Sequence, residues 1–265
     1  MTFSKKHLYY IGAALLLGII FLCSYLLWPK PVRVALVNMP DFIASRMAVA
    51  ADKKNVRLAA VTELTELKNY DAMIAFGMGL KWTDEDRTLI KQLGEERGLK
   101  YLAYMTTTPE NNISNLDSLQ QKTLESYLAN GGTSNYRSAF NYIRKEVLGK
   151  SLRTGTIEEP IEYGYDLLFT DEDPDLAFDS VESFQKFYNE HGYKGGAPRI
   201  ALFTGIAGPF GSSRDYLDEL IETLEESGFN VYPISAMTRR LEFLTEIKPQ
   251  AVIYFAHGRF GGDPA

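Results

Sequence analysis

The chain has 265 residues, of which 45% are hydrophobic and 23% are charged. These are values of a folded globular protein, so general disorder is excluded. The net charge is −6 and no stripe rich in Lys and Arg runs along the sequence, which argues against nucleic acid as a partner. The single cysteine, Cys23, lies in a hydrophobic run, so the rest of the chain can form neither a disulfide nor a thiolate metal site.

The segment from Leu8 to Trp28 is an uncharged apolar run of about 21 residues, which spans about 30 Å as a helix and matches the hydrocarbon core of a bilayer. Aromatic residues at both ends are typical of membrane interfaces. We predict an uncleaved, single-pass transmembrane anchor. A cleaved signal peptide has a shorter apolar region ending in small residues, and a lipoprotein signal at Cys23 would need small residues where Ile20-Phe21-Leu22 stands.

The charges around this run predict its orientation. Lys5 and Lys6 precede it, whereas Lys30 and Arg33 follow it. The positive-inside rule favours a cytoplasmic N-terminus. We therefore expect the inner (cytoplasmic) membrane as the location, with the soluble part exported to the periplasmic side.

Residues 1–31 form the predicted anchor and linker, and residues 32–150 a first α/β lobe with a helical extension. Short apolar runs separated by helical patterns indicate βαβ units and a parallel sheet. Strands are predicted at 32–37, 56–61, 72–76 and 99–105, and helices at 42–51 and 82–97. Thr83 is the expected N-cap of the second helix and Gly98 its stop. The extension, 116–148, is two helices separated by Asn130-Gly131-Gly132.

Residues 151–197 are predicted to be an acidic connecting segment, with a helix at 180–190. Its aspartates lack the D-x-[DN]-x-[DN]-G spacing of a calcium loop, so a solvated linker is the favoured interpretation. Residues 198–265 form a second lobe, with strands at 199–203, 230–234 and 251–255 and helices at 213–227 and 238–247.

The predicted fold class is therefore α/β: a transmembrane helix followed by two flavodoxin-like or Rossmann-like parallel-sheet lobes. Three strands make an incomplete doubly wound sheet, so we expect the second lobe to be truncated and the chain to be a fragment of a longer protein.

Two groups of residues are candidates for ligand binding, because both follow strands of the second lobe. Ligands of α/β proteins bind at this edge of the sheet. The first is a glycine-rich loop, with Gly208, Ser212, Ser213 and Arg214 as substrate contacts, although such a loop can also serve only as a turn. The second is His257, a candidate catalytic base or metal ligand, with Arg259 as a substrate contact.

Three segments carry a resemblance to a known family. The first is Tyr127 to Asn135, in which a helix ends in Gly-Gly and an Asn three residues later opens the next helix. The others are the Pro-Arg strand from Pro198, leading by a long helix to Gly228-Phe229-Asn230-Val231-Tyr232-Pro233, and the strand following Lys248-Pro249. In order and spacing this set resembles the N-terminal portion of the CobN/magnesium chelatase H family.

The resemblance implies a large subunit that binds a tetrapyrrole and handles a divalent metal (Co, Mg or Fe). ATP would act only through partner ATPase subunits. Many relatives carry a G-x-Y-H-P segment where this chain has Tyr163-Gly164-Tyr165-Asp166-Leu167, which argues against cobalt insertion into a corrin. Membrane-anchored relatives are associated with haem utilisation, so the resemblance implies either metal insertion or removal of iron from haem.

An alternative remains open on the residues alone. Two α/β lobes on an anchor also fit a non-enzymatic ligand-binding or sensor module, with the ligand between the lobes. A reading frame that continues well beyond Ala265 would favour the chelatase.

Overall fold

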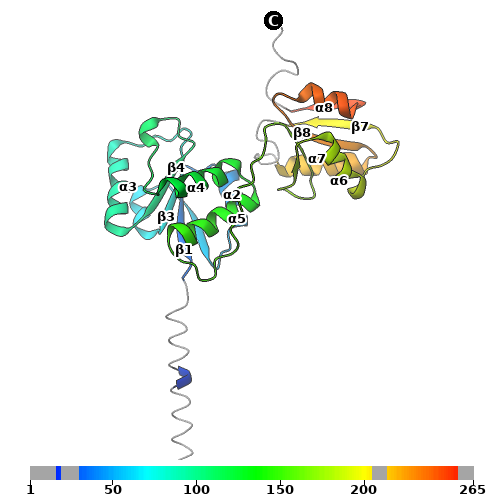
Figure 1. The fold of residues 1–265 in the computed structure, drawn as a ribbon. Helices are drawn as coiled ribbons and strands as arrows, with labels where there is room; N and C mark the ends of the chain where they lie inside the picture. Colours follow the sequence, from blue (N-terminus) through cyan, green and yellow to red (C-terminus); the bar gives the residue numbers. More distant parts are fainter. Residues whose placement is uncertain (1–15, 19–29, 205–213, 256–265) are drawn as a thin grey trace, which may run out of the picture.

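The computed structural model describes residues 16–18, 30–204 and 214–255 and builds two α/β lobes (Figure 1). Leu16 to Gly18 are helical, and the rest of the predicted anchor, Leu8 to Trp28, lies outside the described residues. Within the described part of the chain, no helix has the length and apolar character needed to cross a bilayer. The membrane anchor therefore stays a prediction.

The first sheet has four parallel strands in the order β2-β1-β3-β4, as expected of a Rossmann-like lobe. The strands are β1 (Val32–Val37), β2 (Val56–Val61), β3 (Ala72–Phe76) and β4 (Lys100–Tyr104). Both faces of the sheet are covered, which is why β1 and β3 are almost continuously apolar in sequence.

Helices cover the two faces of this sheet separately (Figure 1). Val34 and Leu36 pack against α2 (Asp41–Ala50), α4 (Ser118–Asn130) and α5 (Thr133–Tyr142), which continues into the π-helix η3 (Ile143–Val147). On the opposite face, Ala35 and Val37 pack with η1 (Leu64–Asn69) and α3 (Asp84–Arg97); a short 3-10 turn, η2 (Pro109–Asn111), follows β4.

The predicted ends of α3 are confirmed. Thr83 and Asp86 form a reciprocal capping box, in which each side chain accepts from the other residue's N–H. Gly98 ends the helix with φ of 72°, a left-handed conformation that glycine adopts without a Cβ clash.

The second sheet is mixed, so the prediction of a purely parallel second lobe was wrong. Its order is β6-β5-β8-β7-β9. Strands β7 (Arg199–Phe203), β8 (Asn230–Ser235) and β9 (Ala251–Tyr254) are parallel, but β5 (Leu167–Phe169) pairs antiparallel with β8 and with β6 (Ala177–Phe178). Sequence analysis missed β5 and β6 because three apolar residues inside an acidic segment are too short to show a period.

In the described part of the second lobe, three helices cover the sheet. On one face lie α6 (Val181–His191) and α8 (Arg240–Ile247), and on the other lies α7 (Arg214–Glu226). The predicted apolar face of α7 is confirmed, since Leu217 and Ile221 are buried and Leu220 and Leu224 pack beside them.

The start of α5 holds the acidic segment in place. Gly131 and Gly132 have φ of 69° and 83°, and their turn exposes the first N–H groups of the helix. The carboxylate of Asp175 accepts from Thr133 N (2.6 Å), Ser134 N (3.0 Å) and Ser134 Oγ (3.2 Å). A negative charge is stabilised there by the helix dipole and the unsatisfied N–H groups.

Asn135 makes a second attachment. Its side chain is 1% exposed and forms two reciprocal 2.9 Å bonds with the backbone of Ile161, one to the carbonyl and one from the N–H. Tyr163 follows, and its hydroxyl donates to the Asp175 carbonyl at 3.0 Å. Asp175 lies between β5 and β6, so these contacts tie the second sheet to α5 of the first lobe.

Replacing Asp175 tests this attachment. Asp175→Ala leaves two N–H groups of α5 without their acceptor and should lower the free energy of unfolding by about 2 kcal/mol. Urea unfolding followed by circular dichroism would measure the change. Glu162→Gln, at an exposed position of the same segment, should change it by less than about 0.5 kcal/mol. Equal effects of the two substitutions would contradict the assignment.

Candidate functional site

The carboxyl edge of the second sheet is the place where an α/β lobe is expected to bind a ligand. Buried polar residues gather there: Thr204 follows β7 and is 3% exposed, and Ser235 ends β8 and is 4% exposed. The predicted contacts Gly208, Ser212, Ser213, His257 and Arg259 all lie outside the described residues, and their roles stay predictions.

Arg214 is the predicted contact that the structure describes. It is the first residue of α7 and is 3% exposed. Its Nε donates to both carboxylate oxygens of Asp218 at 2.6 and 2.8 Å, its Nη2 donates to the Thr170 carbonyl, and its guanidinium lies 5.1 Å from the centre of the Phe169 ring. These contacts join α7 to β5. Burial raises the pKa of Asp218 although Arg214 opposes the shift.

Arg240 occupies the equivalent position on the next helix, and sequence analysis missed it. It is the first residue of α8 and is 8% exposed. Its Nε donates to the Ala236 carbonyl at 2.7 Å and its Nη1 to the Tyr254 hydroxyl at 3.0 Å. Its position relative to Arg214 could have revealed it in the sequence. Each arginine is the first residue of the helix that follows one of two consecutive parallel strands.

Positive charge at this edge also comes from the first lobe. Arg46 of α2 is half-buried, and its pKa is lowered, first by burial and then by the positive charge of Arg214. Tyr136, Asp215 and Asp218 oppose the shift. Arg46 of the first lobe therefore lies within the electrostatic influence of Arg214, whose own charge is paired with the carboxylate of Asp218. Guanidinium groups are the side chains that recognise carboxylates by charge-assisted hydrogen bonds.

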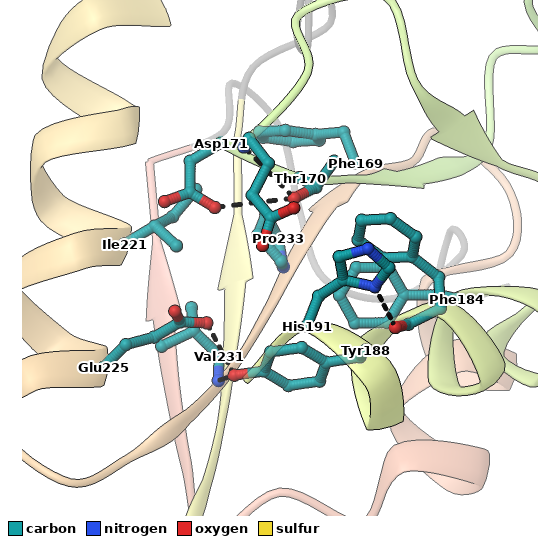
Figure 2. A pocket seen from close by; sticks show the side chains of 12 residues that line it. Phe169, Thr170, Asp171, Phe184, Tyr188, His191, Ile221, Glu225, Val231 and Pro233 are labelled. Carbon is teal, nitrogen blue, oxygen red and sulfur yellow. Dashed lines mark hydrogen bonds between the residues drawn. The ribbon is translucent and has the colours of Figure 1, made fainter. Parts of the chain in front are cut away.

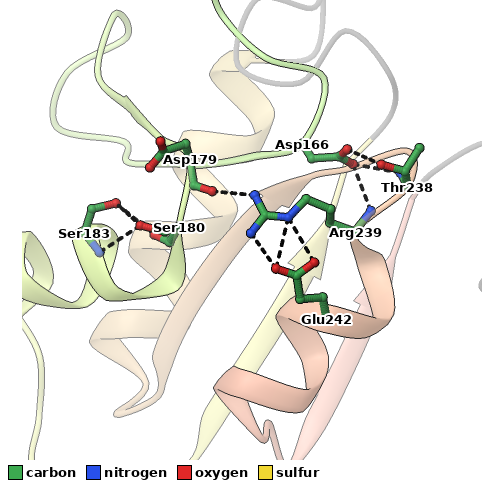
Figure 3. Close-up of polar contacts among 7 residues, drawn as sticks. All are labelled: Asp166, Asp179, Ser180, Ser183, Thr238, Arg239 and Glu242. Carbon is green, nitrogen blue, oxygen red and sulfur yellow. Dashed lines mark hydrogen bonds and ion pairs between the residues drawn. The ribbon is translucent and has the colours of Figure 1, made fainter.

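Asp166 organises the turn before α8 (Figure 3). Its Oδ1 accepts from the N–H groups of Met237 (2.6 Å), Thr238 (2.8 Å) and Arg239 (3.2 Å), and its Oδ2 accepts from the Thr238 hydroxyl. Burial by itself would raise the pKa of Asp166, but these hydrogen bonds outweigh it and lower the pKa. Arg239 then links Glu242 to the carbonyl of Asp179 (Figure 3).

A small cavity lies beneath the end of β5 (Figure 2). Its volume is about 10 Å³, which is room for one water molecule at most. Tyr188 at its wall donates to Glu225 at 2.6 Å and accepts from Val231 N at 2.9 Å. Strand β5 pairs only with the end of β8, so the N–H of Val231 at the start of β8 has no strand partner on that side and donates to the Tyr188 hydroxyl instead. Pro233, between them, has no N–H that needs an acceptor.

A wider hollow of about 470 Å³ lies at the opposite, amino edge of the second sheet. Arg199 on its wall donates to the Ile247 carbonyl at 2.8 Å and to the Tyr193 hydroxyl at 3.3 Å. This hollow is away from the edge where parallel sheets bind ligands, so we do not assign it as the site.

The described residues hold no group of three or more His, Cys, Asp or Glu side chains that could bind a metal ion. Asp171, Glu172, His191 and Glu225 all line the small cavity, but they form no such group. The predicted metal ligand, His257, lies outside the described residues and is not tested by this finding.

Residues 125–265 match the family model for CobN/magnesium chelatase. The chain belongs to the CobN/magnesium chelatase family. The resemblance found in the sequence is thereby confirmed, and the match includes the glycine pair before α5, Asp175 and the whole second lobe.

Among solved structures, the chain is similar to the catalytic subunit of cobaltochelatase from Mycobacterium tuberculosis, with a TM-score of 0.56 at 16% sequence identity. The similarity covers 84% of this chain and 18% of that chain, so this chain spans about a fifth of the length of its structural relative. At this identity the likeness shows the fold alone. Comparison with curated proteins gave no match.

Tyr188→Phe tests the hydrogen bonds that the Tyr188 hydroxyl makes with Val231 of β8 and with Glu225. The substitution leaves the Val231 N–H and the Glu225 carboxylate without their common partner, so the free energy of unfolding should fall by about 1–3 kcal/mol. Chemical unfolding would measure it. Tyr216→Phe, at a tyrosine that is 76% exposed, serves as the matched control and should have little effect. A neutral Tyr188→Phe would show that the bond is dispensable.

Asp166→Asn tests the turn before α8. Because the folded-state pKa of Asp166 is lowered, its stabilisation is present above the unfolded-state pKa and is lost as the pH falls through the folded-state value. The variant should lose about 1 kcal/mol near neutral pH and show a shallower acid-induced loss of stability. Thermal unfolding across the acidic range, with the exposed Glu190→Gln as control, measures both. If the stability of Asp166→Asn fell with decreasing pH as steeply as that of the unsubstituted protein, the assignment would be contradicted.

Proposed function

We propose that this chain is the N-terminal portion of a membrane-anchored, CobN-like chelatase that acts on a tetrapyrrole. The single observation that carries the proposal is the family match over residues 125–265. The membrane-anchoring part rests on the uncharged run from Leu8 to Trp28.

The electrostatics of the candidate site support an acidic macrocycle. Porphyrins carry propionate carboxylates, and guanidinium groups recognise carboxylates by charge-assisted hydrogen bonds. Arg214 and Arg240 place two guanidinium groups at the carboxyl edge of the second sheet, the first of them paired with Asp218, and the charge of Arg214 lowers the pKa of Arg46. In the proposal, Arg259 adds a further carboxylate partner, and Gly208, Ser212 and Ser213 form the loop that contacts the macrocycle.

The direction of the reaction can be metal insertion or iron removal from haem. Either direction needs a base or acid for the pyrrole protons and a ligand for the metal, and His257 is the proposed residue for both roles. Asp166 belongs to the segment that differs from the G-x-Y-H-P type, and its carboxylate accepts hydrogen bonds from the turn before α8. ATP hydrolysis is assigned to partner ATPase subunits.

Macrocycle titration tests the proposal. The full-length natural protein in detergent should shift the Soret absorbance of haem or of a metal-free porphyrin. Porphyrin fluorescence appearing from haem would identify iron removal. Starting from a metal-free porphyrin, loss of fluorescence on adding Co²⁺, or a shift to the emission of the magnesium porphyrin on adding Mg²⁺, would identify insertion. Unchanged spectra with every porphyrin and corrin offered would overturn the proposal and favour the anchored ligand-binding or sensor module.

Two separate histidine substitutions test the proposed role of His257. His257→Ala should abolish metal transfer while leaving most of the Soret shift of a metal-free porphyrin, because it removes the proposed metal ligand and not the carboxylate partners. His191→Ala is the control: His191 stacks on Phe187 with 3.9 Å between ring centres and belongs to α6. Equal activity of the two variants would remove His257 from the mechanism.

A further inference from the structure

The amino edge of the first sheet lies directly after the predicted anchor. Only Pro29 to Pro31 separate Trp28 from the first residue of β1, a reach of roughly 10 Å. Because all four strands are parallel, the turns that enter β2, β3 and β4 lie on this same edge. If the run from Leu8 to Trp28 spans the bilayer, this edge of the lobe is the part next to the membrane surface.

A buried arginine fixes the position of the edge relative to the linker. Arg144 is fully buried, and its Nη1 donates to the carbonyls of Lys30 (3.2 Å) and Asn55 (3.1 Å). Its Nη2 donates to the Leu152 carbonyl at 3.0 Å. The linker, the turn before β2 and the loop after η3 therefore converge on one guanidinium group.

The linker, the turn before β2 and the loop after η3 expose mainly positively charged side chains. Lys53 and Lys54 are exposed in the turn, and Arg153 is exposed in the loop. Two nearby carboxylates are engaged locally: Asp52 accepts from the side chain of Asn55, and Asp71 pairs with Lys150 at 3.0 Å. This basic edge, defined as Lys30, Lys53, Lys54, Lys150, Leu152 and Arg153, contrasts with a net charge of −6 for the whole chain.

Leu152 is a second, independent feature of the basic edge. Its side chain is 69% exposed and lies in the loop between Lys150 and Arg153. Favourable interaction with a helix dipole does not explain these residues. It would place basic residues in the last turn of a helix, whereas Lys53 and Lys54 lie in the turn after α2. It also gives no reason for an exposed leucine. Basic residues around an exposed apolar side chain are the pattern of a surface that meets the membrane interface.

We propose that the basic edge binds the anionic phospholipid headgroups of the membrane that holds the anchor, with Leu152 entering the interfacial layer. The inference rests on the anchoring part of the proposed function and is independent of the tetrapyrrole part. The contact holds the first lobe upright on the bilayer, with the carboxyl edge of its sheet directed away from the surface.

Site-specific quenching tests the contact in the full-length protein. In a Cys23→Ser background, Ser151→Cys places a fluorophore in the loop beside Leu152 and leaves every charge in place. Thr107→Cys places it at the exposed, opposite edge of the same sheet. The protein is reconstituted into nanodiscs of phosphatidylcholine, or of equal parts phosphatidylcholine and phosphatidylglycerol, carrying headgroup-attached quenchers.

Quenching at position 151 should be about twofold stronger in the anionic nanodiscs and should fall at high salt, since headgroup attraction is screened by ions. Position 107 should remain unquenched in both. Lys53→Glu with Lys54→Glu should reduce quenching at 151 to the phosphatidylcholine level. Lys81→Glu with Lys91→Glu, an exposed pair outside the basic edge, should not.

The outcomes distinguish the membrane anchor from the headgroup contact. Protein that fails to enter nanodiscs would overturn the anchor and the headgroup contact together. Protein that enters them but shows equal quenching at positions 151 and 107, or no response to phosphatidylglycerol, would overturn the headgroup contact alone. Neither outcome affects the macrocycle titration, which reports on the tetrapyrrole.

Discussion

The carboxylate of Asp175 at the start of α5 is the interaction on which the arrangement of this protein depends. Gly131 and Gly132 turn the chain so that the first N–H groups of α5 are available, and Asp175 occupies them. The same acidic segment supplies β5 and β6 to the second sheet. One carboxylate therefore satisfies a helix terminus of the first lobe and positions two strands of the second.

That arrangement has an electrostatic consequence at the candidate site. Arg46 of α2 comes close enough to Arg214 of α7 for the second charge to lower the pKa of the first. Asp218 offsets part of the charge, and burial raises the pKa of Asp218 itself. Holding cations together at the ends of parallel strands is unfavourable in an empty site and favourable once an anion is bound. In the proposed function, that anion is an acidic macrocycle.

The first lobe serves a different purpose in this scheme. Arg144 joins the linker, the turn before β2 and the loop after η3 by hydrogen bonds from one buried guanidinium group, so the three backbone segments of the basic edge are held together. In the proposed scheme the first lobe contacts the membrane on one side and the second lobe through α5 on the other, and it would set the height and orientation of the candidate site.

The sequence by itself determined the elements whose signals are local. The parallel strands of the first sheet are apolar runs, the apolar face of α7 repeats with helical spacing, and α3 is bounded by Thr83 and Gly98. Only the tertiary structure decided the roles of Asp175, Arg144 and Arg240, because their partners are distant in sequence or are backbone carbonyls, which no residue pattern reveals. Strand β5 belongs with them: three residues make a strand only when β8 offers them an edge.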